Sequence, residues 1–126
     1  MSDFKENAIR PVSLLPIWNV AEGKLEEATS LVGQAVEIAG GEPECLDFTL
    51  AINGNKLFLR ELFTDAAAVQ FHLKCVSSVV ASLRSIASLD SIIVMGPQDQ
   101  LDLLKETLAP FKPVLTLFST QNGFRK

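Results

Sequence analysis

Two residues in the middle of the chain carry side chains suited to proton transfer. Glu61 shares the apolar side of an alternating segment with Leu57, Leu59 and Phe63. A bare carboxylate costs several kcal/mol at such a position unless it is paired, hydrogen-bonded or protonated. His72, the one histidine of the sequence, falls on the buried stripe of the helix that follows. A carboxylate that orients an imidazole is suited to take a proton from an acidic phenol or quinol.

A structural interpretation of the same residues stays open. Glu61 and the histidine could merely satisfy each other, as buried pairs with perturbed pKa values often do, or Glu61 could turn from the sheet edge to solvent. Trp18 is typical of a core or interface position, and Cys75 of a small hydrophobic side chain. Arg60 is expected to balance Asp47, although an anionic substrate could compete for it.

The segment that carries Glu61 is predicted to be the second strand of a hairpin. Two alternating runs flank Asn53-Gly54, a pair that tolerates positive φ and favours a two-residue turn. The turn predicts a register in which four pairs face each other: Leu50 with Leu57, Phe48 with Leu59, Leu46 with Glu61, and Asp47 with Arg60. The last pair joins opposite charges, so the apolar match and the charge match agree.

The surrounding elements follow from periodicity and from glycine and proline positions. A strand over 11–20 is apolar on both faces, and Pro16 predicts a bulge or unpaired position within it. Helical spacing and capping residues predict three helices, and two further apolar runs predict strands. The helices are expected over 22–39, ended by Gly40-Gly41, from Thr64-Asp65 towards Leu89, and from Pro97 to Pro110; the strands are expected over 91–95 and 113–118.

This order predicts an α+β fold of the ferredoxin-like β-α-β-β-α-β type, with an antiparallel sheet and an added C-terminal helix and strand. We expect a lead-in over 1–10, one domain over 11–118 and a tail over 119–126. The helices would cover one face of the sheet. The other face, with Trp18, Phe58 and Leu62, would stay partly apolar, which predicts dimerisation.

Composition excludes several classes of function. Eleven Lys and Arg against fifteen Asp and Glu give a net charge of −4, the wrong sign for binding nucleic acid. No apolar run approaches the ~20 residues of a membrane span, and the polar first ten residues do not resemble a signal peptide. One histidine and no Cys-x-x-Cys pair argue against the usual zinc sites. A cytoplasmic protein is expected.

The stretch from Glu61 to His72 resembles the signature of antibiotic biosynthesis monooxygenase-type (ABM) domains of the dimeric α/β-barrel superfamily. In that pattern a Glu ends the third strand, an aromatic residue follows two positions later, a polar residue caps the helix, and Ala and His come next. Matching positions here are Glu61, Phe63, Asp65, Ala68 and His72. Pro16-Ile-Trp-Asn-Val20, Gly23 and Glu44-Cys-Leu46 are also similar, and the resemblance spans about residues 12–95.

The resemblance implies a homodimer with facing sheets and a pocket between helices and sheet in each subunit. It implies oxidation of phenolic or quinol-like aromatic substrates by O₂ without a metal, flavin or other cofactor. His72 would act as base or hydrogen-bond donor together with Glu61, and Asn19, Trp18 and Phe63 would be pocket residues. The haem-degrading branch uses a second histidine that this chain lacks, so haem is not an expected ligand.

Two functions follow as hypotheses. The first is a cofactor-independent monooxygenase acting on a small aromatic or quinol-like molecule. The second is a non-catalytic dimeric domain of the same superfamily that binds a small ligand or serves in regulation. Residues 97–118 lie outside the shared pattern and are expected to extend the sheet or to reach the partner subunit.

Overall fold

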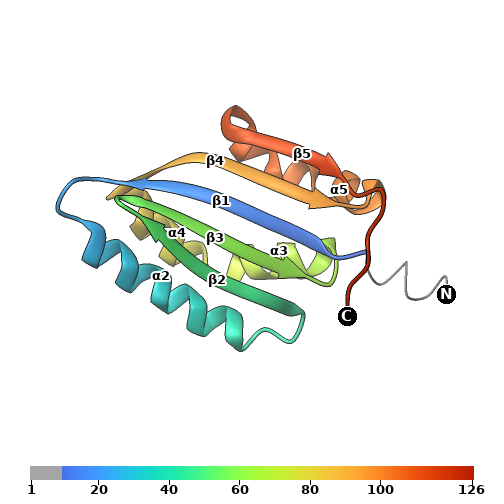
Figure 1. The fold of residues 1–126 in the computed structure, drawn as a ribbon, viewed down its shortest axis with the longest axis horizontal. Coiled ribbons are helices and arrows are strands. Elements are labelled where there is room, and N and C mark those ends of the chain that lie inside the picture. The colour runs from blue at the N-terminus through green and yellow to red at the C-terminus, as the bar shows by residue number, and fades with distance from the viewer. Residues whose placement is uncertain (1–9) are drawn as a thin grey trace.

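One five-stranded sheet organises the chain in the computed structural model, which describes residues 10–126. The strand order is β2-β3-β1-β4-β5, with β1 in the centre (Figure 1). Neighbours among the first four strands are antiparallel, whereas β5 runs parallel to β4, so the sheet is mixed. The strands are β1 (Val12–Val20), β2 (Cys45–Asn53), β3 (Lys56–Phe63), β4 (Ala87–Gly96) and β5 (Leu115–Ser119).

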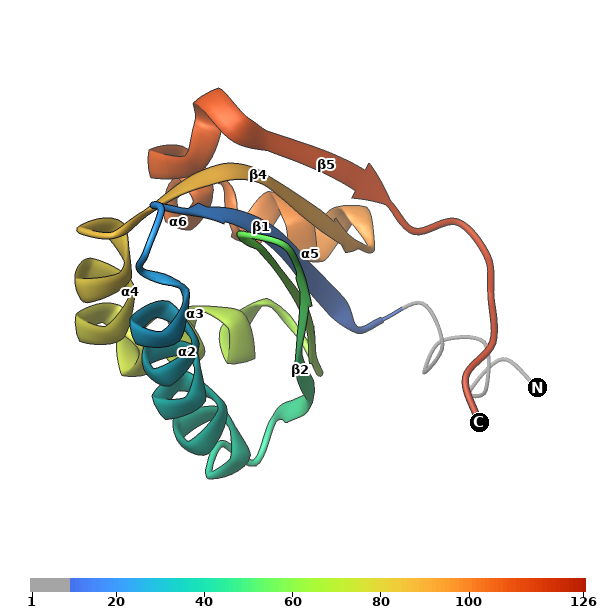
Figure 2. The same cartoon turned by 60° about the vertical axis from the view of Figure 1, so that its left-hand side comes forward.

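The helices gather on one face of this sheet and leave its other face bare (Figures 1 and 2). They are α2 (Leu25–Gly40), α3 (Ala66–Cys75), α4 (Ser77–Arg84), α5 (Gln98–Leu103), α6 (Lys105–Leu108) and the 3₁₀ helix η1 (Ala109–Val114). This arrangement confirms the predicted ferredoxin-like α+β fold with its C-terminal helix and strand. The added strand pairs with β4 of its own chain.

The β2–β3 hairpin forms, but the predicted register was wrong by two residues. Leu50 faces Leu59 and Phe48 faces Glu61, because Asn53 pairs with Lys56 and the turn is Gly54-Asn55. Gly54 adopts a φ of +58°, which glycine accepts without strain. An even shift keeps every side chain on its predicted face.

The ion pair expected across the hairpin survives this shift as a diagonal contact. Arg60 lies opposite Thr49 instead of Asp47. Its Nε still donates to the Asp47 carboxylate at 2.8 Å, because diagonal neighbours in a sheet are within reach of long side chains.

The helix expected from Thr64-Asp65 to Leu89 is two helices. α3 and α4 meet at Val76 with a bend of 62°. The strand expected to begin at Ser91 begins at Ala87, because Ala87 and Leu89 pair with the far end of β1. No single helix in the described part of the chain is long and apolar enough to cross a membrane. The bent α3–α4 pair meets the length and composition criteria for a span, and these two criteria are the whole basis of that result.

Strand β1 turns its even-numbered residues, from Val12 to Val20, toward the helices. Trp18 therefore lies in the core, 4% exposed, and its predicted place on the open face was wrong. The register against β4 shifts between Ile17 and Trp18, which confirms a bulge next to Pro16. Proline has no N–H for a ladder bond and favours such irregular positions.

The C-terminal segment adds a second layer of apolar packing beside α3. Leu101, Leu104 and Leu108 are buried as predicted, in one cluster with Phe63 of β3 and Val94 of β4. The predicted helix over this stretch is interrupted at Leu104 and is followed by η1, which contains two prolines. The expected lead-in over 1–10 falls almost entirely outside the described residues, and the domain boundaries stay a prediction.

Candidate active site

A histidine between two carboxyl groups forms the centre of the site. Nδ1 of His72 lies 2.9 Å from a carboxyl oxygen of Glu42, and Nε2 lies 3.4 Å from Oε1 of Glu61. All three residues are buried, with 2%, 7% and 5% exposure for His72, Glu42 and Glu61. Both ring nitrogens are therefore engaged by acidic partners, an arrangement that favours the imidazolium form.

Three different elements hold these groups. Glu61 projects from β3, and Glu42 lies in the turn after α2, whose end is marked by Gly40-Gly41. His72 comes from α3, which begins at a firm cap because the Asp65 carboxylate accepts a hydrogen bond from the Ala68 N–H at 2.9 Å. Convergence of a helix, a strand and a turn fixes the ring from all sides.

Aromatic packing and a side-chain bond complete this support. The ring centres of Phe63 and Phe48 lie 4.9 and 5.3 Å from the centre of the imidazole ring, and both rings are tilted against it. The Gln100 side chain of α5 accepts the Ala66 N–H at 2.8 Å and ties the C-terminal segment to the start of α3. The histidine ring is thus held by packing as well as by its two acids.

The electrostatics of the cluster move both titrating groups in the same direction. Burial raises the pKa of Glu61, although the nearby His72 opposes this shift. Burial by itself would lower the pKa of His72, but the hydrogen bonds and charges of Glu61 and Glu42 outweigh it and raise that pKa. A carboxylate with a raised pKa is a stronger base, nearer to the operating pH of a general catalyst.

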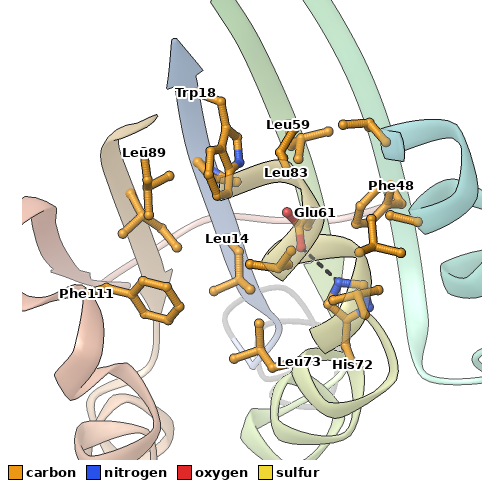
Figure 3. Close-up of a pocket in the computed structure, with 17 residues that line it drawn as sticks. Leu14, Trp18, Phe48, Leu59, Glu61, His72, Leu73, Leu83, Leu89 and Phe111 are labelled. Carbon is orange, nitrogen blue, oxygen red and sulfur yellow. Dashed lines mark ion pairs between the residues drawn. The ribbon is translucent and has the colours of Figure 1, made fainter. Parts of the chain in front are cut away.

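An enclosed pocket opens beside this cluster, between the helices and the sheet (Figure 3). Its wall is apolar except for Glu61 and His72. The centre of a water-sized sphere can move through about 70 Å³ of it. On that measure one water needs only about 10–15 Å³, so a small molecule fits. The lining residues that Figure 3 labels are Leu14, Trp18, Phe48, Leu59, Glu61, His72, Leu73, Leu83, Leu89 and Phe111.

The predicted site residues fall into three groups. Glu61 and His72 meet, and Trp18 lines the same pocket. Phe63 packs against the His72 ring but is not part of the pocket wall. Asn19 does not reach the site, because it follows the inward-facing Trp18 and alternation turns it outward, where it is exposed.

Three residues in or near the site carry no clear signal in the sequence. Glu42 stands in a polar turn between Gly41 and Pro43, which is typical of an ordinary surface loop. The one hint of Glu42 was that a buried histidine has two ring nitrogens, whereas the sequence offered only Glu61 as a partner. Phe111 and Arg84 come from η1 and the end of α4, and only their folded positions bring them to the pocket region.

The described residues contain no group of three or more His, Cys, Asp or Glu side chains arranged to hold a metal ion. Both cysteines are free thiols, Cys45 on β2 and Cys75 at the end of α3. Glu61 and His72 line the pocket wall, and Glu42 contacts His72 from outside it.

Known structures resemble this one over most of the chain. MupZ from Pseudomonas fluorescens is 26% identical with a TM-score of 0.86, and the match covers 93% of this chain and 95% of that one. Because only 7% of this chain falls outside the match, most of the C-terminal addition has a counterpart in MupZ. No protein-family model matches the sequence, and no curated protein does.

Two oxygenases share the central fold. SnoaB, a cofactor-independent oxygenase from Streptomyces nogalater, is 17% identical with a TM-score of 0.61, covering 68% of this chain and 90% of its own. An antibiotic biosynthesis monooxygenase is 18% identical with a TM-score of 0.61, covering 67% and 95%. Each of these matches leaves nearly a third of this chain uncovered. The chain therefore has the fold of the ABM-type domains, as its Glu61-to-His72 signature predicts.

Proposed function

We propose that this protein is a cofactor-independent monooxygenase that oxidises a small phenol or quinol in the pocket beside Glu61. The observation that carries the proposal is a carboxyl group that is buried in an otherwise apolar pocket wall and whose Oε1 lies 3.4 Å from Nε2 of a histidine. The fold shared with SnoaB, a cofactor-independent oxygenase, supports the same reaction class.

Glu61 is the group that takes the proton from the substrate. One of its carboxyl oxygens turns toward His72 and the other turns away from it (Figure 3). His72 stabilises the ionised form of Glu61, and Glu42 in turn balances the imidazolium from the far side of the ring. Because burial raises the pKa of Glu61, the carboxylate binds the phenolic proton more strongly than an exposed glutamate would.

The reaction balances without any further reagent for a phenol with a free para C–H. The phenolate, once its proton is on Glu61, passes one electron to O₂, and the resulting radical pair combines to form a C–O bond. Glu61 returns its proton to the peroxide, and the O–O bond then breaks as the para hydrogen leaves. One oxygen atom stays as a quinone carbonyl and the other departs as water, so the substrate supplies all four electrons.

The apolar wall serves this chemistry in two ways. It excludes water from the phenolate, and the low local polarity strengthens the interaction between Glu61 and His72. The limited volume of the pocket favours a substrate of one or two aromatic rings, which agrees with a small phenol or quinol.

A homodimer is part of the proposal. The bare face of the sheet carries Leu15, Ile17, Phe58, Ile93 and Met95, with Phe118 of β5 beside them, on adjoining strands. Phe58 is 39% exposed and Phe118 52% exposed. Two such faces packed together would bury an apolar surface that a monomer leaves in water.

Oxygen uptake tests the function directly. We expect the wild type to consume O₂ with members of a panel of phenols and hydroquinones such as 1-naphthol, and to place ¹⁸O from ¹⁸O₂ in the product. Glu61→Gln and His72→Ala should lower the rate by about 10²–10⁴-fold, the usual contribution of a general base. Glu37→Gln, an exposed change on α2, should leave it unchanged. Incorporation that is absent from the wild type, or kept by Glu61→Gln, would contradict the proposal.

A non-catalytic ligand-binding domain is the second candidate. The observation in its favour is that both ring nitrogens of His72 already have partners, which a structural pair also requires. In that case small aromatic molecules would bind without oxygen uptake, and Glu61→Gln would change only the stability of the fold.

A further inference from the structure

Arg84, at the end of α4, is a cation without an acidic partner beside the pocket. Among the described residues, no carboxylate lies within ion-pair distance of its guanidinium. The guanidinium instead lies 5.9 Å from the ring centre of Trp18 and 5.8 Å from that of Phe111. At these distances cation–π attraction favours the guanidinium beside the two rings, and among the described residues its N–H donors have no carboxylate partner.

Both of these rings line the inner pocket that holds Glu61. A second hollow lies outside it, and the two share Leu89 and Phe111 as walls. Arg84 is the one charged residue that lines the outer hollow, whose other walls are Ala87, Ser88, Pro110, Pro113 and Val114. The apolar inner pocket, which contains Glu61, thus adjoins the outer hollow, which Arg84 lines.

We propose that Arg84 binds the carboxylate of an amphipathic aromatic substrate whose ring lies in the inner pocket facing Glu61. The inference rests on the proposed function and narrows its substrate to an aromatic acid. A planar guanidinium fork matches a carboxylate with two parallel N–H···O bonds, and its single positive charge balances the single negative charge of the carboxylate. Arg84 acts in recognition and takes no part in the proton transfer.

A purely structural role for Arg84 is also consistent with its place in the last turn of α4. There the helix dipole favours a positive charge and stabilises the fold. Such a role moves stability but not ligand preference, so binding separates the two roles.

Fluorescence of Trp18, the one tryptophan of the chain, reports binding in the inner pocket. The probes are benzoate, phenylacetate, 3-phenylpropanoate, 4-phenylbutyrate and 5-phenylpentanoate, each paired with the alcohol of the same length. The full chain is titrated as wild type, Arg84→Gln, Arg84→Lys and Lys74→Gln. Lys74 is the matched control, because it is the one lysine of α3 and α4, is exposed as Arg84 is, and lies outside both hollows.

We expect the wild type to bind at least one acid about tenfold more tightly than its alcohol, as a charge-assisted hydrogen bond provides. Arg84→Gln should abolish this preference, Arg84→Lys should keep part of it, and Lys74→Gln should keep all of it. A wild type that favours no acid over its alcohol, or a preference that persists in Arg84→Gln, would overturn the proposal. Acid preference in Glu61→Gln should stay, so the binding result stands independently of the oxygen assay.

Discussion

Glu42 shows how one residue outside the pocket can control the group inside it. Its carboxylate accepts a hydrogen bond from Nδ1 of His72, so the ring presents Nε2 to Glu61. Without that partner the imidazolium would lose one of the two acids that stabilise it. Glu42 is therefore a positioning residue, which acts on the substrate only through His72.

We expect Glu42→Gln to lower the pKa of His72, because the neutral amide no longer stabilises the imidazolium by its charge. The lone histidine gives a single Hε1 resonance, so an NMR titration of that proton measures this pKa without residue assignment. The pH profile of oxygen uptake should shift to lower pH as well. Glu44→Gln, two residues along the same turn and exposed, is the control. An unchanged pKa in Glu42→Gln would rule out the positioning role.

The 3₁₀ helix η1 gives the pocket a wall that the β-α-β-β-α-β core lacks. Phe111, near its middle, lines the inner pocket, forms part of the outer hollow and has its ring centre 5.8 Å from the Arg84 guanidinium. Pro110 and Pro113 flank it and fix the backbone φ on both sides, which favours a stiff segment. The C-terminal addition thus determines how enclosed the pocket is.

Phe111→Ala should open the wall between the two hollows. Bound 4-phenylbutyrate should then dissociate at least about tenfold faster, measured by stopped-flow Trp18 fluorescence, since the lost ring removes both contact and stacking. Because Phe111 is half-buried, the unfolding free energy should fall by about 1–2 kcal/mol, less than the ~3–5 kcal/mol of a fully buried ring. Leu103→Ala, a change at an exposed side chain of α5, should leave the dissociation rate unchanged. Equal rates in the wild type and Phe111→Ala would show that η1 is no wall for the ligand.

The whole molecule has one covered and one bare sheet face. All helices lie against the face that carries Leu14, Trp18 and Glu61, and the pocket forms there (Figure 2). The bare face is apolar near its centre, around Ile17 and Phe58, and charged near Asp47 and Arg60. An apolar centre with a polar rim is typical of a surface that packs against a second copy.

Phe58→Glu should halve the mass that sedimentation velocity measures, because it puts a charge in the middle of the proposed interface. Binding of aromatic acids should survive if each subunit holds its own complete pocket. The matched control is Leu103→Glu, an equally drastic change at an exposed apolar residue on the helical side. A wild type that sediments as a monomer would contradict the homodimer.

Local patterns predicted much of the fold. Alternation, Asn53-Gly54 and the cap at Asp65 suffice to place the hairpin and the start of α3, because turn and cap chemistry act over a few residues. The register was shifted because the turn residues are Gly54-Asn55, with the positive φ at Gly54, and the pattern alone leaves this position and Asn53-Gly54 both open. The break at Val76 also lies beyond local pattern, since α3 and α4 pack against different parts of the molecule.

By itself the sequence determined that an acid and the lone imidazole face the same layer, because strand and helix periods fix the side on which Glu61 and His72 lie. Only the tertiary structure decided that Glu42 holds the other ring nitrogen, that Asn19 stays outside, and that Arg84 lies beside the rings of Trp18 and Phe111. These contacts join a turn, two helix ends and a C-terminal segment far apart along the chain. Periodicity carries no information about such distances, which packing alone sets.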